Sequence, residues 1–290
     1  MYHTSETPQD TTLPVLSVLI PASNEEALIS VCLASLAKCT WSSDARVEII
    51  VISNGSSDRT ADVANEFRAQ FTKRGWAMHV LDREEGGKLA ALNAGDRIAR
   101  AGIRIYLDAD VTVDPALLEQ VYETLSTHQP RYCSGALRIA HAKNWVTRAY
   151  ARVYSRVPFL THGVPGAGLF AVNAAGRMRW GEFPKIISDD TFVRLSFRPD
   201  ERVAVDAGYT WPLVEGWSNL VRVRRRQNEG VDEIRDRFPE LLENDDKPAF
   251  PAIQKLKIAL RDPVGFAVYS GVALAVRLTP KSATAWSRGR

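Results

Sequence analysis

Residues 13–26 read LPVLSVLIPASNEE, and the expected architecture is built outward from them. Val15–Ile20 is rich in valine, leucine and isoleucine and stops at Pro21, which is typical of a strand buried on both faces. Polar residues follow, among them Asn24, whose side chain suits a helix cap, and apolar residues then recur at helical spacing over residues 28–36. A strand that leads directly into a helix is the repeating unit of an α/β fold.

The same alternation continues along the chain. Apolar strands are expected at Val47–Ile52, Trp76–Leu81 and Ile103–Leu107, separated by helices at Asp58–Phe71 and Lys88–Ala101. This order predicts a mostly parallel central sheet flanked by helices. Ligands bind such sheets beyond the carboxyl ends of the strands, so functional residues are expected there.

After about residue 115 the alternation is less regular. Helices are expected over residues 115–128, 144–157 and 190–197, and strands over residues 132–139 and 168–172. The second half of the chain is therefore expected to differ in construction from the first.

The composition is that of a globular protein. The chain has 290 residues, 45% apolar and 24% charged, which excludes a disordered chain, a collagen-like repeat and a polytopic membrane protein. The net charge of +3 is too small to indicate a nucleic-acid partner. Cys32, Cys39 and Cys133 lack metal-ligand spacing and fit a reducing compartment. Residues 1–13 contain no apolar signal segment, so we expect a cytoplasmic protein.

Two aspartates, Asp108 and Asp110, end the expected strand at Ile103–Leu107. Carboxylates this close repel each other, and a hard divalent cation relieves the repulsion while it binds phosphate oxygens as well. The alternative is a turn at the strand end with two solvated aspartates. The position at the carboxyl end of a strand strengthens the case for a metal but leaves both interpretations open.

Two further motifs lie at expected helix starts. Gly86-Gly87-Lys88 suits a phosphate, because glycine lets backbone approach a ligand and lysine adds a positive charge. It matches neither the Walker P-loop nor the dinucleotide fingerprint, and an ordinary glycine loop is the alternative. Asp189 and Asp190 suit either a general base or favourable charges at a helix N-terminus.

A third stretch, residues 162–168, is HGVPGAG. Gly166, Ala167 and Gly168 would let backbone pack close to a ligand. His162 is a candidate second base or metal ligand, although a lone histidine is more often neither.

Five motifs occur in order along residues 15–230, and together they resemble the inverting glycosyltransferases of family 2, which have the GT-A fold. The motifs are Pro21–Glu26, Ser53–Asp58, Lys88–Asn93 with Gly95, Asp108–Asp110 and Asp189-Asp190. The resemblance implies a GT-A domain over residues 14–240, with a nucleotide-binding half at 14–114 and an acceptor-binding half at 115–240. Before it lies an expected flexible tail, residues 1–13, and after it a linker and helical segment, residues 241–290.

The resemblance assigns the nucleotide to the first two motifs. The turn of Pro21, Ala22, Ser23 and Glu25 would hold the base and ribose of a nucleoside diphosphate sugar. Asn54 stands where the family usually has an aspartate facing the base, which leaves uracil and guanine open, with UDP favoured over GDP.

The resemblance also assigns the diphosphate and its metal. Lys88 would lie near the diphosphate. Asp108, with Ala109 beside it, would lie near the ribose and metal, and Asp110 would be the main ligand of Mn²⁺ or Mg²⁺.

The catalytic base implied by the resemblance is Asp190, which would deprotonate the acceptor hydroxyl. Asp189 takes the place of the family's glutamate. The expected activity is a metal-dependent transfer of sugar to a hydroxyl acceptor, either lipid-linked or a precursor of a cell-surface glycan.

Processive members of the family carry Q-x-x-R-W, and this chain does not. Arg226 and Gly230 fit a looser pattern, but Gln227 replaces the tryptophan, so transfer of a single sugar is expected. Arg224 and Arg226 are candidates for binding the diphosphate or an acceptor phosphate. An arginine-rich surface helix is the alternative.

The C-terminal segment raises the question of membrane contact. Val264–Val276 is apolar but too short to span a bilayer. Lys255, Lys257 and Arg261 suit anionic headgroups. The segment is expected either to dock on the catalytic domain or to make peripheral contact with the inner face of the plasma membrane, which would suit a lipid-linked acceptor.

Two other functions are compatible with the fold. A nucleotidyltransferase that makes the sugar nucleotide also uses paired aspartates and a metal. Its usual glycine-rich, basic loop after the first strand is absent here. A non-catalytic sugar-nucleotide binding protein is the other alternative, and the presence of Asp108, Asp110 and Asp190 disfavours it.

Overall fold

The computed structural model describes residues 13–278, so nearly all of the expected N-terminal tail lies outside it. Within this range the chain forms one sheet in the order β3-β2-β1-β4-β7-β6-β8-β5. The strands are β1 (Pro14–Ala22), β2 (Arg46–Asn54), β3 (Ala77–Arg83), β4 (Ile103–Leu107), β5 (Thr112–Val113), β6 (Tyr132–Ile139), β7 (Leu169–Val172) and β8 (Arg202–Trp211).

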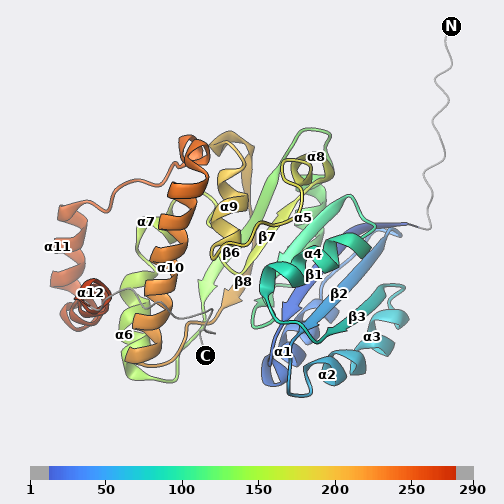
Figure 1. Cartoon of the computed structure of the whole chain (residues 1–290), viewed down its shortest axis with the longest axis horizontal. Helices are drawn as coiled ribbons and strands as arrows, with labels where there is room; N and C mark the ends of the chain where they lie inside the picture. Colours follow the sequence, from blue (N-terminus) through green and yellow to red (C-terminus); the bar gives the residue numbers. More distant parts are fainter. Residues whose placement is uncertain (1–12, 279–290) are drawn as a thin grey trace, which may run out of the picture.

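Helices cover this sheet, and the C-terminal helices lie beyond it at one end of the molecule (Figure 1). They are α1 (Glu26–Ala37), α2 (Thr60–Glu66), α3 (Arg68–Lys73), α4 (Lys88–Ile98), α5 (Leu117–Leu125), α6 (Trp145–Tyr154), α7 (Pro158–Thr161), α8 (Ala174–Arg177), α9 (Asp189–Leu195), α10 (Trp217–Arg237), α11 (Ala252–Arg261) and α12 (Pro263–Leu278), with 3₁₀ turns at Pro199–Glu201 and Pro239–Asn244.

The prediction of a mostly parallel sheet is confirmed. In the first half, β1 pairs in parallel with β2 and β4, and β2 pairs in parallel with β3. In the second half β7 runs antiparallel to both β4 and β6, whereas β6 and β8 are parallel. The change in strand direction at β7 brings the second half of the chain up to the carboxyl end of β4.

Apart from Ser17, the central strand β1 is apolar, because helices cover both faces of the sheet. Leu16 and Val18 belong to a core cluster that includes residues of α1 and α5. Leu19 points the other way and packs with residues of α4 and α9. Because its side chains alternate in direction, β1 contributes to two cores, one on each face of the sheet.

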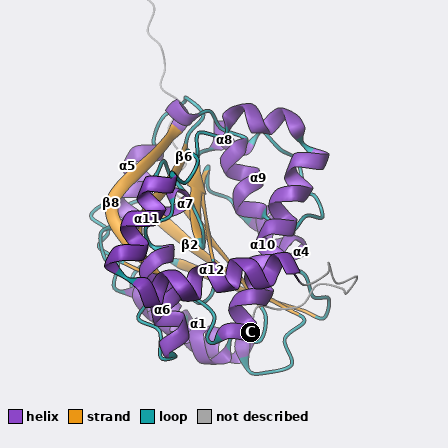
Figure 2. Ribbon diagram, turned by 90° about the vertical axis from the view of Figure 1, so that its left-hand side faces the viewer, coloured by secondary structure: helices purple, strands orange, loops and turns teal. Residues whose placement is uncertain are grey.

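A third cluster joins the C-terminal helices to the domain. Tyr150 and Tyr154 of α6 pack with Leu220 of α10 and Val272 of α12. Figure 2 shows α12 crossing in front of this part of the molecule, beside α6. Of the two expectations for the C-terminal segment, docking on the domain therefore describes α12.

The structure differs from the expected elements at several places. The helix expected over residues 58–71 is two short helices, because the amide of Phe67 bonds to the Ala64 carbonyl only three residues back and tightens the turn. Strand β8 was not expected at all. Asn24 does not cap α1, since its side chain accepts a hydrogen bond from the Ser57 amide instead.

No helix in the stretch 13–278 is both long enough and apolar enough to cross a membrane.

Candidate functional site

The ammonium group of Lys88 joins the two acidic motifs. Its Nζ lies 2.8 Å from Asp108 Oδ1 at the end of β4 and 3.0 Å from Asp189 Oδ2 at the start of α9. Residues that are 20 and 101 positions apart in the chain thus meet at the carboxyl edge of the sheet. A small pocket opens here, lined by Pro21, Lys88, Leu92, Tyr106, Leu107, Asp108, Gly168, Phe170, Asp189 and Asp190.

Close packing of α4 on the sheet sets the position of Lys88. A Cβ at Gly95 would lie 2.9 Å from the Ile52 side chain and 3.0 Å from that of Leu19, so a larger residue would have to displace these side chains or lift α4 from the sheet. Asn93 accepts a hydrogen bond of 2.7 Å from the Phe183 amide and donates one of 3.2 Å to its carbonyl. The motif from Lys88 to Gly95 therefore fixes the helix both to the sheet and to the segment that leads into α9.

Asp189 and Asp190 occupy the first turn of α9, where the helix dipole favours negative charge. The Ser188 side chain makes no capping hydrogen bond, and Asp189 pairs with Lys88. Asp190 accepts a hydrogen bond from the amide of Thr191. The acidic pair thus does more than favour the helix start, because one member binds the lysine of another element.

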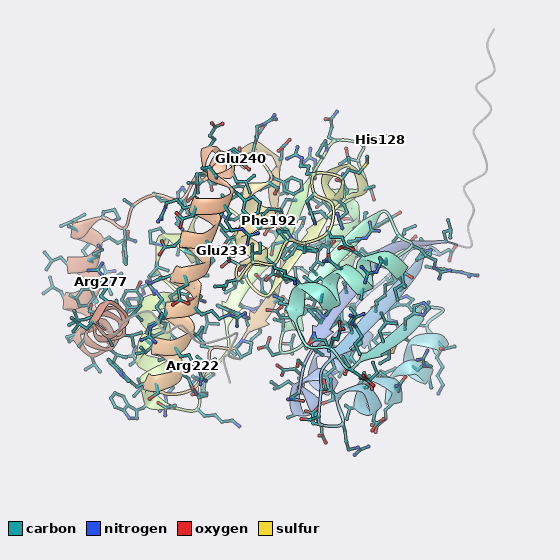
Figure 3. All side chains as sticks on the ribbon, viewed as in Figure 1. His128, Phe192, Arg222, Glu233, Glu240 and Arg277 are labelled. Atoms are coloured by element: carbon teal, nitrogen blue, oxygen red, sulfur yellow. The ribbon has the colours of Figure 1, made fainter. Side chains whose placement is uncertain are left out.

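Helix α10 packs directly against this turn. The Ile187 amide donates a 2.8 Å hydrogen bond to Glu233, and a Cβ at Gly230 would overlap the Ser188 hydroxyl. Figure 3 labels Phe192 on α9 and Glu233 on α10, the helix that this hydrogen bond joins to the start of α9. Gly230, which sequence reasoning considered only as part of a processivity pattern, is therefore what lets α9 lie this close.

Burial and neighbouring charges shift the pKa values of both Lys88 and Asp190. Burial disfavours the charged form of Lys88, but the carboxylates of Asp108 and Asp189 outweigh burial and raise the lysine pKa well above its ordinary value. Burial and then the charge of Asp189 raise the pKa of Asp190 to about 6, while Lys88 opposes the rise. At neutral pH the pocket thus holds a charged ammonium beside a carboxylate whose basicity is increased.

Three loops at the carboxyl ends of β1, β2 and β3 are linked to one another. Asn24 adopts a positive φ of 52° and binds the Ser57 amide at 2.7 Å, while the Glu25 amide donates to Thr60 Oγ1 at 2.8 Å. Ser53 donates to Asp82 at 2.8 Å. The turn expected to hold a nucleotide base is therefore rigid.

Ser23 Oγ and Asn54 Oδ1 are buried without a hydrogen-bond partner within residues 13–278, as is Arg83 Nε at the end of β3. Ser23 follows β1 and Asn54 ends the neighbouring strand β2, and Pro21 and Ala22 form the end of β1 beside them. A buried polar atom that lacks a partner costs free energy, and a ligand that supplies one recovers it. The pair marks a place for the polar edge of a ligand.

The glycine-rich loop reaches the site through its backbone. The Asp108 amide donates a 2.9 Å hydrogen bond to the Gly168 carbonyl, and Ala167 accepts one of 2.8 Å from Tyr209. Gly166 has a φ of 67° and packs against Tyr132. His162, by contrast, is exposed at the end of α7, and in the described part of the chain no contact connects it with Lys88 or the aspartates.

Of the two candidate arginines on α10, Arg224 lies among other helices. Arg224 donates to the Tyr150 hydroxyl at 3.0 Å and to that of Tyr269 at 3.3 Å, and so connects α10 with α6 and α12. Arg226 is half-buried on the same helix. The contacts of Arg224 are those of a residue that holds helices together.

The acidic turn after β4 carries two carboxylates, those of Asp108 and Asp110. Burial, followed by the charges of Asp110 and Asp108, raises the pKa of the Cys32 thiol beneath the turn, and the small side chain of Ala109 is buried between them. In the segment that the structure covers, no three acidic, cysteine or histidine side chains converge on a metal position. Two carboxylates fit a Mg²⁺ or Mn²⁺ ion that takes its remaining oxygens from phosphates and water.

One structural cluster near the pocket was missed by sequence reasoning. Asp96 of α4 is 2.9 Å from both Arg104 and Arg177, and it accepts a 2.9 Å hydrogen bond from the hydroxyl of Tyr106, whose ring lines the pocket. No local spacing marks this cluster, since its members come from α4, β4 and α8.

Comparison with known proteins agrees with this arrangement. The family model described as glycosyl transferase family 2 matches residues 17–178, more than half of the chain. The chain is 33% identical over 138 residues to a probable glycosyltransferase, YdaM, of Bacillus subtilis, covering 47% of this chain and 33% of YdaM. It is 31% identical over 115 residues to the glycosyltransferase AglE of Haloferax volcanii, covering 40% and 36%. The chain thus spans about a third of the length of these curated relatives.

Solved structures share the fold at low sequence identity. The crystal structure of S. aureus TarS 1–349 in complex with UDP-GlcNAc has a TM-score of 0.54 and 16% identity, covering 90% of this chain and 81% of that one. The mannosyltransferase PcManGT from Pyrobaculum calidifontis, in complex with GDP-Man and Mn²⁺, has a TM-score of 0.56 and 19% identity, covering 92% and 76%. The fold is therefore GT-A, and the chain belongs to glycosyl transferase family 2.

Proposed function

We propose that this protein transfers a single sugar from a nucleoside diphosphate sugar to a hydroxyl acceptor, with inversion at the anomeric carbon. The observation that carries the proposal is the position of Lys88 between Asp108 and Asp189, with Asp190 next along α9. A cation for the diphosphate and a base for the acceptor thus line one pocket. TarS and PcManGT, which share the fold, were solved with sugar nucleotides.

In the proposed mechanism Asp190 accepts the proton of the acceptor hydroxyl as that oxygen attacks the anomeric carbon. Attack from the face opposite the leaving group inverts the configuration and needs no covalent enzyme intermediate. Lys88 stabilises the negative charge that develops on the departing nucleoside diphosphate. Asp189 holds the ammonium group of Lys88 in place.

Asp110 and Asp108 are the residues that would hold a divalent cation, Mn²⁺ or Mg²⁺. When bound, it would supply positive charge to the diphosphate oxygens.

The turn of Pro21, Ala22, Ser23 and Glu25 is proposed to hold the nucleotide base and ribose. An N–H of the base, N3–H in uracil or N1–H in guanine, would donate to the buried Oδ1 of Asn54. The preference for UDP over GDP rests on the family resemblance and not on this atom. The backbone at Gly166, Ala167 and Gly168 would line the sugar side of the pocket.

His162, Arg224 and Arg226 are weaker candidates, because the contacts described above do not place them at the pocket.

The acceptor is proposed to be a hydroxyl-bearing molecule, either lipid-linked or a precursor of a cell-surface glycan. Contact with a membrane would suit the lipid-linked case.

The proposal is tested by incubating the full chain with a panel of UDP- and GDP-sugars, Mn²⁺ and hydroxyl acceptors. Release of the nucleoside diphosphate and an inverted anomeric signal in the product by NMR are expected, and both are lost in Asp190→Asn. Release of pyrophosphate from a nucleoside triphosphate would instead indicate a nucleotidyltransferase. Binding of a sugar nucleotide without any release would indicate a non-catalytic protein.

A further inference from the structure

Helix α11 exposes an apolar side. Ile253, Leu256 and Leu260 are 61%, 54% and 76% exposed, and their spacing of three and four residues puts them on one side of the helix. The neighbouring Ile258 is buried against the domain. The helix thus has two apolar sides, of which the domain covers only one.

A pocket of about 380 Å³ lies between this helix and the segment around α7. It is lined by Arg156, Thr161, Gln254, Lys257, Ile258 and Arg261. Three of these side chains are cations, and all three are exposed. Ile253, Lys257 and Arg261 are spaced four residues apart and so lie along one line on the helix. The two cations are therefore beside the exposed apolar side.

The three cations lack partners of their own. Among residues 13–278, the side chains of Arg156, Lys257 and Arg261 form no hydrogen bond or ion pair. The nearby carboxylate, Asp262, is bound by Arg152 at 2.7 Å, and Arg156 only adds its charge from further away. Asp262 is also the one acidic residue in the stretch 251–278, which contains four basic ones.

We infer that α11 docks on the surface of an anionic lipid bilayer, with the phosphate of a lipid headgroup in the pocket of Arg156, Lys257 and Arg261. Charge complementarity favours a phosphate, and the apolar side chains favour one that carries acyl chains. A free phosphate would fill the pocket but leave Ile253, Leu256 and Leu260 in water. Helices that lie in the membrane interface combine these two features.

The position of the helices is compatible with such docking. Figure 1 shows α11 and α12 at one end of the molecule, opposite α2 and α3. In Figure 2 this end faces the viewer, with α11 at the surface. The inference does not depend on the proposed transferase activity, since it concerns a surface of the chain outside the pocket of Lys88.

The test is co-sedimentation of the full chain with vesicles, without any sugar nucleotide. One set contains phosphatidylcholine alone, and the other contains equal parts of phosphatidylcholine and phosphatidylglycerol. Binding to the second set only is expected. Each basic residue at an anionic surface contributes about 1 kcal/mol, so the double variant Lys257→Gln/Arg261→Gln should bind about 25-fold more weakly.

The matched control is Arg46→Gln/Lys73→Gln, which removes the same charge from two exposed residues outside the proposed surface. It should bind as the unchanged protein does. Leu256→Ser/Leu260→Ser, which keeps every charge, should lower vesicle binding about tenfold. Asp190→Asn should bind vesicles normally, so failure of the catalytic proposal and failure of this one are distinguishable.

Several results would overturn the inference. Equal binding to both vesicle types, or an equal loss of binding in the control variant, would show that the pocket does not bind an anionic lipid headgroup. Calorimetric binding of inorganic phosphate without vesicle binding would show a site for a soluble anion. Self-association that is lost in Leu256→Ser/Leu260→Ser would show that a second copy covers the helix.

Discussion

At the scale of single residues, Lys88 is the group on which the site depends. Asp108 and Asp189 hold its ammonium from two sides, and together they raise its pKa enough to keep it charged at neutral pH. Removing it would leave the buried carboxylate of Asp189 without its cation, which costs several times more than losing an exposed ion pair. The same group thus stabilises the folded pocket and meets the leaving group in the proposed reaction.

The role proposed for Asp190 predicts a specific kinetic defect. Asp190→Asn keeps the shape of the side chain but cannot accept the proton, so kcat should fall about 10²- to 10⁴-fold. Affinity for the nucleoside diphosphate should stay unchanged. Steady-state kinetics and calorimetry check the two halves of this prediction, and a variant with near-normal kcat would contradict the assignment of the base.

The pKa of Asp190, raised to about 6, predicts the acid limb of the activity profile. A base must be deprotonated to act, so kcat/KM should fall as the pH drops below about 6. Lys88 lowers this pKa, and Lys88→Met should therefore move the limb to higher pH as well as slow the reaction. The measurement is kcat/KM against pH at a fixed, saturating metal concentration. A limb that stays in place in Lys88→Met would contradict the electrostatic coupling.

Sequence reasoning identified these residues by type and position, but not their contacts. The acidic pair after β4 and the glycine-lysine loop stand out because they follow apolar strands. The ion pair between Lys88 and Asp189 could not be foreseen, since it depends on how the second half of the chain returns to the sheet. Asn24 was misinterpreted for a related reason: its side chain bonds to Ser57, a residue of the next loop.

At the scale of elements, the site depends on two close packings, that of α4 on the sheet and that of the first turn of α9 on α10. Gly95 lets α4 lie on the sheet, and Gly230 of α10 lets the first turn of α9 lie against that helix. The regular first half was predictable, because each apolar run ends in polar loop residues. Strand β8 was missed although Val203 and Val205 alternate with other residues in RVAVDAGYTW, as in a strand with one buried face.

The contact at Gly230 predicts that a single methyl group impairs the base. In Gly230→Ala the Cβ would overlap the Ser188 hydroxyl, so the turn that carries Asp190 must shift. A displacement of about 1 Å costs roughly 100-fold in kcat. Gly181→Ala is the matched control, because nothing lies within 4 Å of its added Cβ. Similar kcat values for the two variants would show that α10 does not position α9.

At the scale of the whole molecule, the C-terminal helices are part of the folded unit. Helix α12 packs on α6 and α10, and Arg224 binds the hydroxyls of Tyr150 and Tyr269 across that junction. The sequence indicated an apolar segment too short to span a bilayer, which was correct for α12. The sequence could not indicate that α12 would pack on α6 and α10, because these two helices also carry polar residues on their other sides.

Arg224 therefore has a predicted role in stability. Arg224→Leu leaves two tyrosine hydroxyls without their charged donor, and the free energy of unfolding should fall by about 2 kcal/mol. Thermal unfolding measures the change, which corresponds to a midpoint lower by about 4 °C. Arg222→Leu, an exposed change on the same helix, should have little effect. A large loss of nucleotide affinity in Arg224→Leu with unchanged stability would instead support a role at the diphosphate.

The central claim is that the edge of the sheet around Lys88, Asp108 and Asp110 binds a nucleoside diphosphate together with a divalent cation. The most direct test is a calorimetric titration of the full chain with UDP and with GDP, each with and without Mn²⁺. Mn²⁺-dependent binding of UDP in preference to GDP is expected, and it should be lost in Asp110→Ala while the thermal midpoint is kept. Folded protein that binds neither nucleotide, or binds one equally well without Mn²⁺ and in Asp110→Ala, would contradict it.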